Sequence, residues 1–141
     1  MIMVNSIWLS RNVIAELKQL LEQMYDPGVE ICGWIAGTME EKNNGRATNI
    51  FTLHNISNSK YSFAVDVEEY VNIRSYILSL QLHPLAFYHS HPYGQVQPSY
   101  RDLEFQNVIG SPCMIFSLLK DDIVFYAFER LNNKIRSIQI I

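Results

Sequence analysis

The fold of this chain is constrained most by four polar residues, His89, His91, Ser99 and Asp102. They span the end of one apolar segment and the start of another. The apolar, aromatic segment 85–91 follows one proline and precedes another, which predicts a strand. Alternate residues of a strand point to one face, so His89 and His91 should lie side by side. Seven residues separate His91 from Ser99, a natural N-cap for a helix with Asp102 in its first turn. If the intervening loop folds over the histidines, Asp102 can reach them.

Two imidazoles and a carboxylate form a ligand set that suits zinc, which binds neutral imidazole nitrogen and carboxylate oxygen. Three protein ligands leave the fourth position open to water, which is typical of a catalytic zinc rather than a structural one. The sequence therefore predicts one Zn2+ per chain, held by His89, His91 and Asp102.

Two further residues suit hydrolysis at such a site. Glu30 opens a predicted strand over residues 30–40 among apolar neighbours, where a carboxylate is costly to bury unless it has a partner such as zinc-bound water. We therefore expect Glu30 to act as the general base, and the hydroxyl of Ser99 to donate to the oxyanion of a tetrahedral intermediate. Each residue alone has an ordinary structural explanation, but the agreement of spacing, order and element context favours the metal site.

These residues resemble the JAMM motif of the MPN/JAB metallopeptidase family, compact prokaryotic branch. The motif is carried by Glu30 with Cys32-Gly33, by His89-Ser90-His91-Pro92 and by Pro98-Ser99-Tyr100-Arg101-Asp102. The resemblance covers nearly the whole chain, and no motif position departs from the family pattern. It implies that His89, His91 and Asp102 are zinc ligands, that Glu30 is the general acid/base and that Ser99 stabilises the oxyanion.

The resemblance also implies a reaction and a partner. Members with the complete motif cleave peptide or isopeptide bonds next to the C-terminal tail of ubiquitin-like proteins. We therefore expect hydrolysis after the C-terminal glycine of a ubiquitin-like protein or a β-grasp sulfur carrier, in processing or in deconjugation. The few remaining histidines and cysteines form no close cluster, so a second zinc is not expected.

Two alternatives have different sequence requirements. Relatives without the ligands are non-catalytic scaffolds that recognise ubiquitin-like proteins, and the complete ligand set disfavours that function here. A zinc deaminase needs Pro-Cys-x-x-Cys, and Pro112-Cys113 lacks the second cysteine.

Patterning along the rest of the chain predicts a three-layer α/β fold in a single domain, residues 1–141, with a mixed sheet flanked by helices. This is also the MPN/JAB architecture, similar to that of cytidine deaminases. Helices are predicted over residues 11–24, 66–80 and 100–108, and strands over 30–40, 47–55, 61–65, 85–91, 114–119, 123–129 and 135–141. Asp66 and Glu69 resemble a capping box, and Tyr76 is expected on the apolar side of its helix. Asn43-Asn44-Gly45 predicts a hairpin.

Composition restricts the partners and the location. The net charge of −3, without a basic patch, disfavours nucleic acid. Apolar stretches are too short for a membrane span, and the first residues do not resemble a signal peptide. Two cysteines provide no disulfide framework, so we expect a reducing cytoplasm.

Two features of the sequence, in the loop after His91 and at Cys32, can each be interpreted in two ways. Tyr93 and Val96 are expected to contact substrate, and Gly94 to allow close approach of an extended peptide, but ordinary loop geometry explains them equally well. Cys32 shares the strand face of Glu30, so a nucleophilic or redox role competes with that of a small buried side chain.

Overall fold

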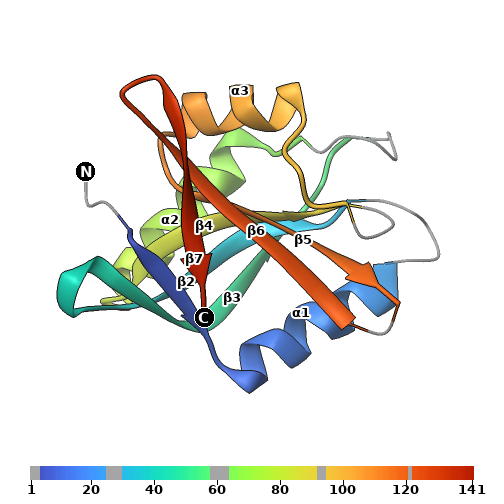
Figure 1. Ribbon diagram of the computed structural model, residues 1–141, viewed down its shortest axis with the longest axis horizontal. Helices are drawn as coiled ribbons and strands as arrows, with labels where there is room; N and C mark the ends of the chain where they lie inside the picture. The colour runs from blue at the N-terminus through green and yellow to red at the C-terminus, as the bar shows by residue number, and fades with distance from the viewer. Residues whose placement is uncertain (1–3, 25–29, 58–63, 92–94, 121) are drawn as a thin grey trace.

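Strands of both directions form the centre of the protein (Figure 1). The computed structural model describes residues 4–24, 30–57, 64–91, 95–120 and 122–141. The strands among these residues are β1 (Ser6–Leu9), β2 (Cys32–Glu40), β3 (Asn44–Leu53), β4 (His83–Ser90), β5 (Cys113–Leu119), β6 (Asp122–Leu131) and β7 (Lys134–Ile140). The helices are α1 (Arg11–Met24), α2 (Val67–Ser79) and α3 (Tyr100–Ile109), and a 3-10 turn covers Glu41–Asn43.

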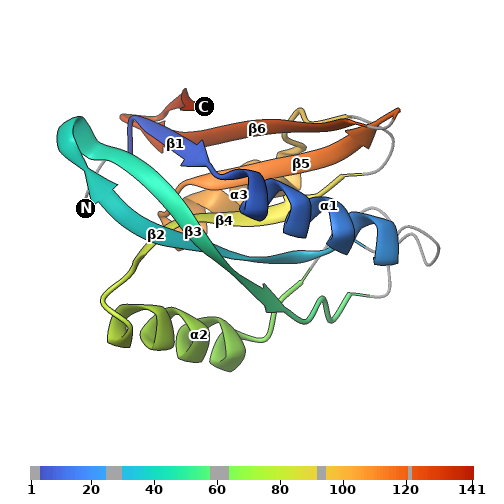
Figure 2. The same ribbon diagram turned by 90° about the horizontal axis from the view of Figure 1, so that it is seen from below.

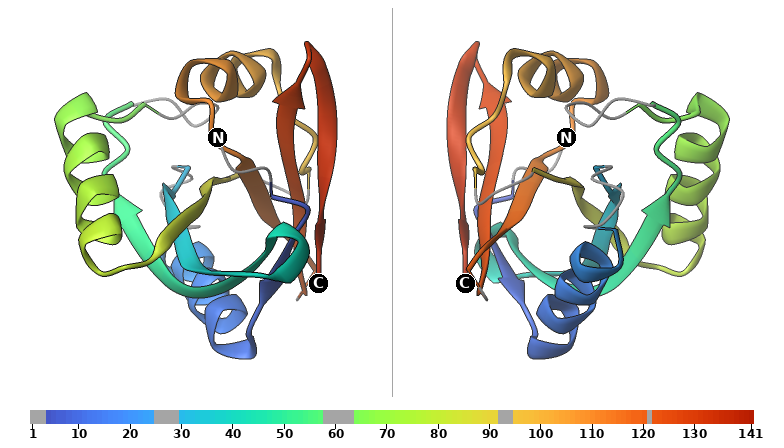
Figure 3. Two further views of the ribbon diagram at one scale, coloured as in Figure 1. Left: turned by 90° about the vertical axis from the view of Figure 1, so that its left-hand side faces the viewer. Right: turned by 90° about the vertical axis from the view of Figure 1, so that its right-hand side faces the viewer.

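The strand order is β1-β3-β2-β4-β5-β6-β7, and β1 also pairs with β7, so the sheet closes on itself. Strand β1 runs parallel to β3 and β7, and β4 runs parallel to β5. The other neighbours are antiparallel. Figure 3 shows the curvature of the closed sheet. The expected mixed sheet flanked by helices is confirmed.

The helices cover opposite faces of the sheet, as Figure 2 shows for α1 and α2 on either side of β2 and β3. Helix α1 begins where the Ser10 hydroxyl accepts a hydrogen bond from the Val13 amide at 3.2 Å. Its buried stripe packs against the sheet face that includes Tyr88. Helices α2 and α3 pack on the other face, where Phe87 contacts their aromatic rings. Because β4 alternates, His89 lies on the face of Phe87, beside α3.

Several local predictions are wrong at α2. Asp66 is the N-cap and accepts a hydrogen bond from the Glu68 amide at 3.1 Å, but no capping box forms. The Glu69 carboxylate instead accepts from the His54 amide at 2.6 Å and contacts His54 Nδ1 at 2.7 Å, so a partner distant in sequence replaces the local one. Tyr76 is 54% exposed although its ring contacts Phe51, so it lies at the edge of the buried side of the helix rather than within it.

The strand boundaries differ from the predictions at a few ends. Strand β2 begins at Cys32, so Glu30 precedes the strand rather than opening it. The predicted hairpin is confirmed, with its turn at Glu41–Asn43, where Lys42 and Asn43 have positive φ. Of the predicted strand 61–65, residues 61–63 lie outside the described residues, and the remaining two are not in a strand. No helix in the described part of the chain is both long and apolar enough to span a membrane.

Candidate metal centre

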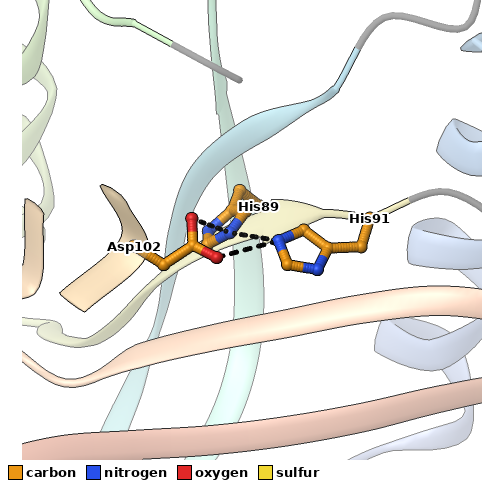
Figure 4. Close-up of side chains that lie close together, drawn as sticks. All are labelled: His89, His91 and Asp102. Atoms are coloured by element: carbon orange, nitrogen blue, oxygen red, sulfur yellow. Dashed lines mark hydrogen bonds and ion pairs between the residues drawn. The ribbon is translucent and has the colours of Figure 1, made fainter. Parts of the chain in front are cut away.

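The side chains of His89, His91 and Asp102 meet at one point (Figure 4). His89 Nε2 lies 3.0 Å from Asp102 Oδ1, and His91 Nε2 lies 2.9 Å from Asp102 Oδ2. The two Nε2 atoms are 3.1 Å apart. The three predicted ligands, which come from the end of β4 and the first turn of α3, therefore lie together in the folded protein.

His91 is oriented by contacts outside this group. Its backbone amide donates to the Phe116 carbonyl at 2.9 Å, and its carbonyl accepts from the Ser117 hydroxyl at 2.5 Å. Its ring Nδ1 lies 3.1 Å from the carbonyl oxygen of Gln95. If Nδ1 donates its proton to that carbonyl, Nε2 keeps a free lone pair, which is the form that a metal requires.

Asp102 has a second role in the first turn of α3. Its Oδ2 accepts a hydrogen bond from the Ser99 amide at 2.8 Å, and its own amide donates to the Ser99 hydroxyl at 3.2 Å, which completes a capping box. The helix cap therefore fixes the carboxylate in the direction of the histidines. Burial raises the pKa of Asp102, but hydrogen bonds from His89 and His91 outweigh burial and hold that pKa well below its usual range.

The protonation states of His89 and Asp102 suit a cation, whereas His91 must lose a proton to bind one. Burial lowers the pKa of His89, because the charged imidazolium is poorly solvated there. Burial also opposes the charged form of His91, but hydrogen bonding to Asp102 outweighs it and raises the pKa of His91. A metal ion would therefore compete with one proton at His91 and meet an anionic Asp102.

The size of the group fits zinc. Ligand atoms about 2.05 Å from a tetrahedral zinc ion lie about 3.3 Å from one another. Here the two histidine nitrogens are 3.1 Å apart, and one ligand atom from each of the three residues lies within 4.8 Å of the others, so small side-chain movements would bring them to this spacing. Two imidazole nitrogens and a carboxylate oxygen also leave one coordination position open, so the residues present fit the ion that the sequence predicts.

Glu30 lies beside this group. In the pairing of β2 with β4, Cys32 is opposite His89, and continuing the register by two residues places Glu30 opposite His91. Two hydrogen bonds support this register, from the Ile31 amide to the Ser90 hydroxyl and from the Ser90 amide to the Ile31 carbonyl, both 2.9 Å. Glu30 is only 5% exposed.

Burial raises the pKa of Glu30 to about 7; the nearby His91 opposes this shift, and the negative charge of Asp102 adds to it. A carboxyl group with this pKa can both accept and release a proton near neutral pH.

Other predicted site residues have different surroundings. Ser99 is exposed at the start of α3, and its hydroxyl oxygen accepts the cap hydrogen bond. Val96 is partly buried against Cys113, Ile115 and Phe128. Tyr93 and Gly94 lie outside the described residues.

Cys32 is fully buried, and burial raises the pKa of its thiol to about 12, as expected of a small core side chain rather than a reactive thiolate. The supporting contacts of Ser90, Gln95 and Asn55 were not predicted: Ser90 belongs to the motif but its partner Ile31 is distant in sequence, and no local pattern distinguishes Gln95 or Asn55.

The raised pKa of Glu30 predicts a pH-dependent stability of the zinc-free protein. Between the ordinary pKa of 4.5 and about 7, the folded protein keeps the Glu30 proton while the unfolded chain releases it. The stabilisation that this proton provides is complete at low pH and is lost as the pH rises through 7. Glu30→Gln removes this dependence. Relative to the wild type, the variant should therefore gain about 2–3 kcal/mol in unfolding free energy between about pH 5 and pH 8.

Chemical denaturation of both zinc-free proteins at the two pH values measures this difference. His89, His91 and Asp102 are present in both proteins, so the difference measures the titration of Glu30 together with its effect on His91. A difference that does not change with pH would show that Glu30 titrates normally.

Comparison with known proteins agrees with this geometry. A profile of prokaryotic homologues of the JAB domain matches residues 14–129. A desampylase of Haloferax volcanii is 34% identical over 83 residues, which is 56% of this chain and 55% of that protein. The match thus spans little more than half of the length of this archaeal relative.

Two solution structures share the fold. A protein of Desulfitobacterium hafniense superposes with a TM-score of 0.79 at 21% identity, over 96% of this chain and 91% of that one. A protein of Salinibacter ruber gives a TM-score of 0.67 at 19% identity, over 94% and 89%. The family profile covers most of the chain and includes all three predicted ligands. The protein therefore belongs to the family of prokaryotic JAB-domain proteins.

Proposed function

We propose that this protein is a zinc metallopeptidase that hydrolyses the bond after the C-terminal glycine of a ubiquitin-like or sulfur-carrier protein. The observation that carries the proposal is the convergence of His89, His91 and Asp102, with the buried Glu30 opposite His91. The substrate class is supported by the similarity to a desampylase.

His89, His91 and Asp102 would hold the zinc ion. Bound there, zinc supplies Lewis acidity towards the scissile carbonyl and lowers the pKa of a bound water to near 7. The Glu30 carboxylate accepts a proton from the attacking water and then donates it to the leaving amine nitrogen, as the new C–O bond forms and the C–N bond breaks. Its buried position near His91 and Asp102 suits both transfers.

Ser99 stabilises the developing oxyanion. In the helix cap its oxygen accepts a hydrogen bond from the Asp102 amide, so the cap does not use the hydroxyl proton. That proton can be donated to the substrate oxygen while the cap stays intact.

Ser99→Ala should lower kcat by about 10²-fold, the usual effect of removing one oxyanion donor, without loss of zinc. It should also cost about 1 kcal/mol of stability, since the cap of α3 is lost. Steady-state kinetics, zinc content and thermal unfolding measure the three effects.

Ser10→Ala is the matched control, because Ser10 caps α1 through the same type of hydrogen bond, also 3.2 Å long. It should lower stability alone. An equal loss of kcat in both variants would reduce the role of Ser99 to capping.

The test of the proposed function combines metal analysis with two probes made from one β-grasp carrier. One probe continues for several residues beyond the terminal Gly-Gly, and the other joins the same glycine to a lysine side chain. We expect one zinc per chain and cleavage after the glycine in at least one probe. A non-catalytic binding module would bind the carrier without zinc and would cleave neither.

A further inference from the structure

Three hydrogen bonds meet at the side-chain amide of Asn55, two residues beyond the end of β3. Its Nδ2 donates to the backbone carbonyl of Glu30 at 2.8 Å. Its Oδ1 accepts from the amides of Ser57 at 2.9 Å and Ala64 at 3.0 Å. This one side chain therefore connects the segment between β3 and α2 to the residue that carries the proposed base.

Glu30 needs such support because it lies outside β2. The peptide group between Glu30 and Ile31 is also bound from β4, where the Ser90 hydroxyl accepts a hydrogen bond from the Ile31 amide and the Ser90 amide donates to the Ile31 carbonyl of the following peptide group. These bonds hold Ile31 against the strand that carries the two histidines. The Glu30 carbonyl instead accepts a hydrogen bond from Asn55, which follows β3.

We propose that Asn55 is a positioning residue that holds Glu30 in register with His89, His91 and Asp102. This inference rests on the proposed role of Glu30 as the base. The contact requires both ends of an amide: Nδ2 must donate to Glu30, and Oδ1 must accept from Ser57 and Ala64. An aspartate keeps the acceptor and loses the donor, so the two functions of the side chain can be separated.

The rate of a proton transfer depends strongly on the position of the base. A displacement of about 1 Å caused by a change away from the reacting atoms can lower a rate about 10²-fold. Asn55→Asp should therefore lower kcat by up to about 10²-fold, with KM little changed and one zinc still bound. The bonds to Ser57 and Ala64 should persist in this variant.

Asn49→Asp is the matched control. Asn49 lies in β3, is exposed, and uses its Oδ1 to accept a hydrogen bond from the Thr48 hydroxyl at 2.7 Å. The substitution adds the same charge and keeps the same acceptor, away from Glu30. We expect its kcat to match the wild type.

A double-mutant cycle with Glu30→Gln separates positioning from general structural damage. If Asn55 acts through Glu30, adding Asn55→Asp to the Glu30→Gln variant should cause little further loss of turnover. A further loss as large as in the wild-type background would overturn the proposal.

Amide hydrogen exchange provides a measurement that does not depend on activity. Asn55→Asp should speed exchange at the Ile31 amide, next to the released Glu30 carbonyl, and should leave the amide of Phe87 in β4 unchanged. If neither carrier probe is cleaved by the wild type but exchange changes at Ile31 alone, the positioning role stands and the proposed function fails. Unchanged exchange at Ile31 would overturn the positioning role.

Discussion

Glu30→Gln should lower kcat by about 10²–10⁴-fold while the protein still binds one zinc per chain. Glutamine has nearly the same shape as glutamate, so the packing around residue 30 and the backbone bond from Asn55 should persist. It cannot accept the proton of the attacking water, and it cannot return a proton to the leaving amine. Steady-state kinetics on the cleaved carrier probe measure kcat, and metal analysis measures the zinc bound per chain.

Glu129→Gln provides the control for removing a buried carboxylate. Glu129 is 6% exposed, close to the 5% of Glu30, and it pairs with Arg136 rather than with the metal group. Its replacement should lower stability and leave kcat unchanged. Loss of zinc from Glu30→Gln would instead make Glu30 a ligand or a structural residue, and retention of full turnover would exclude it as the base.

Asp102→Asn should weaken zinc binding by more than the 10–100-fold typical of losing a residue that only supports a ligand. The substitution removes the negative charge beside His89 and His91, and it replaces an anionic ligand oxygen by a neutral amide oxygen. The zinc dissociation constant, measured by competition with a chelator of known affinity, gives the effect directly.

The control for Asp102→Asn is Asp66→Asn, which changes the N-cap aspartate of α2. Both carboxylates accept a backbone hydrogen bond at the start of a helix, but Asp66 takes no part in the metal group. Its replacement should leave zinc affinity unchanged. Equal zinc affinity in the wild type and Asp102→Asn would remove Asp102 from the ligand set.

Much of the fold could be predicted because its signals are local. The buried stripe of α1, the Ser10 cap and the left-handed Gly110 that ends α3 all depend on residues within a few positions of one another. Strand β1 was not predicted, since four residues carry little pattern and its partners are the distant strands β3 and β7. Glu69 likewise matches a local capping pattern but binds the distant His54.

In the candidate site, too, some positions depend on local sequence and others on partners distant in sequence. Alternation in β4 and the cap of α3 placed His89, His91 and Asp102 correctly, because each signal lies within one element and a short loop joins them. The positions of Ser90 and Asn55 follow from register between separate strands. That register is set by packing over the whole sheet, and no motif in the sequence encodes it.

Intact-mass spectrometry of the extended carrier tests the central claim most directly. The zinc-loaded protein should remove the residues beyond Gly-Gly, or release the carrier from the lysine-linked probe, leaving a mass that ends at the last glycine. Glu30→Gln should leave both probes intact under the same conditions. Unchanged masses with one zinc bound per wild-type chain, or equal cleavage by Glu30→Gln, would contradict the account.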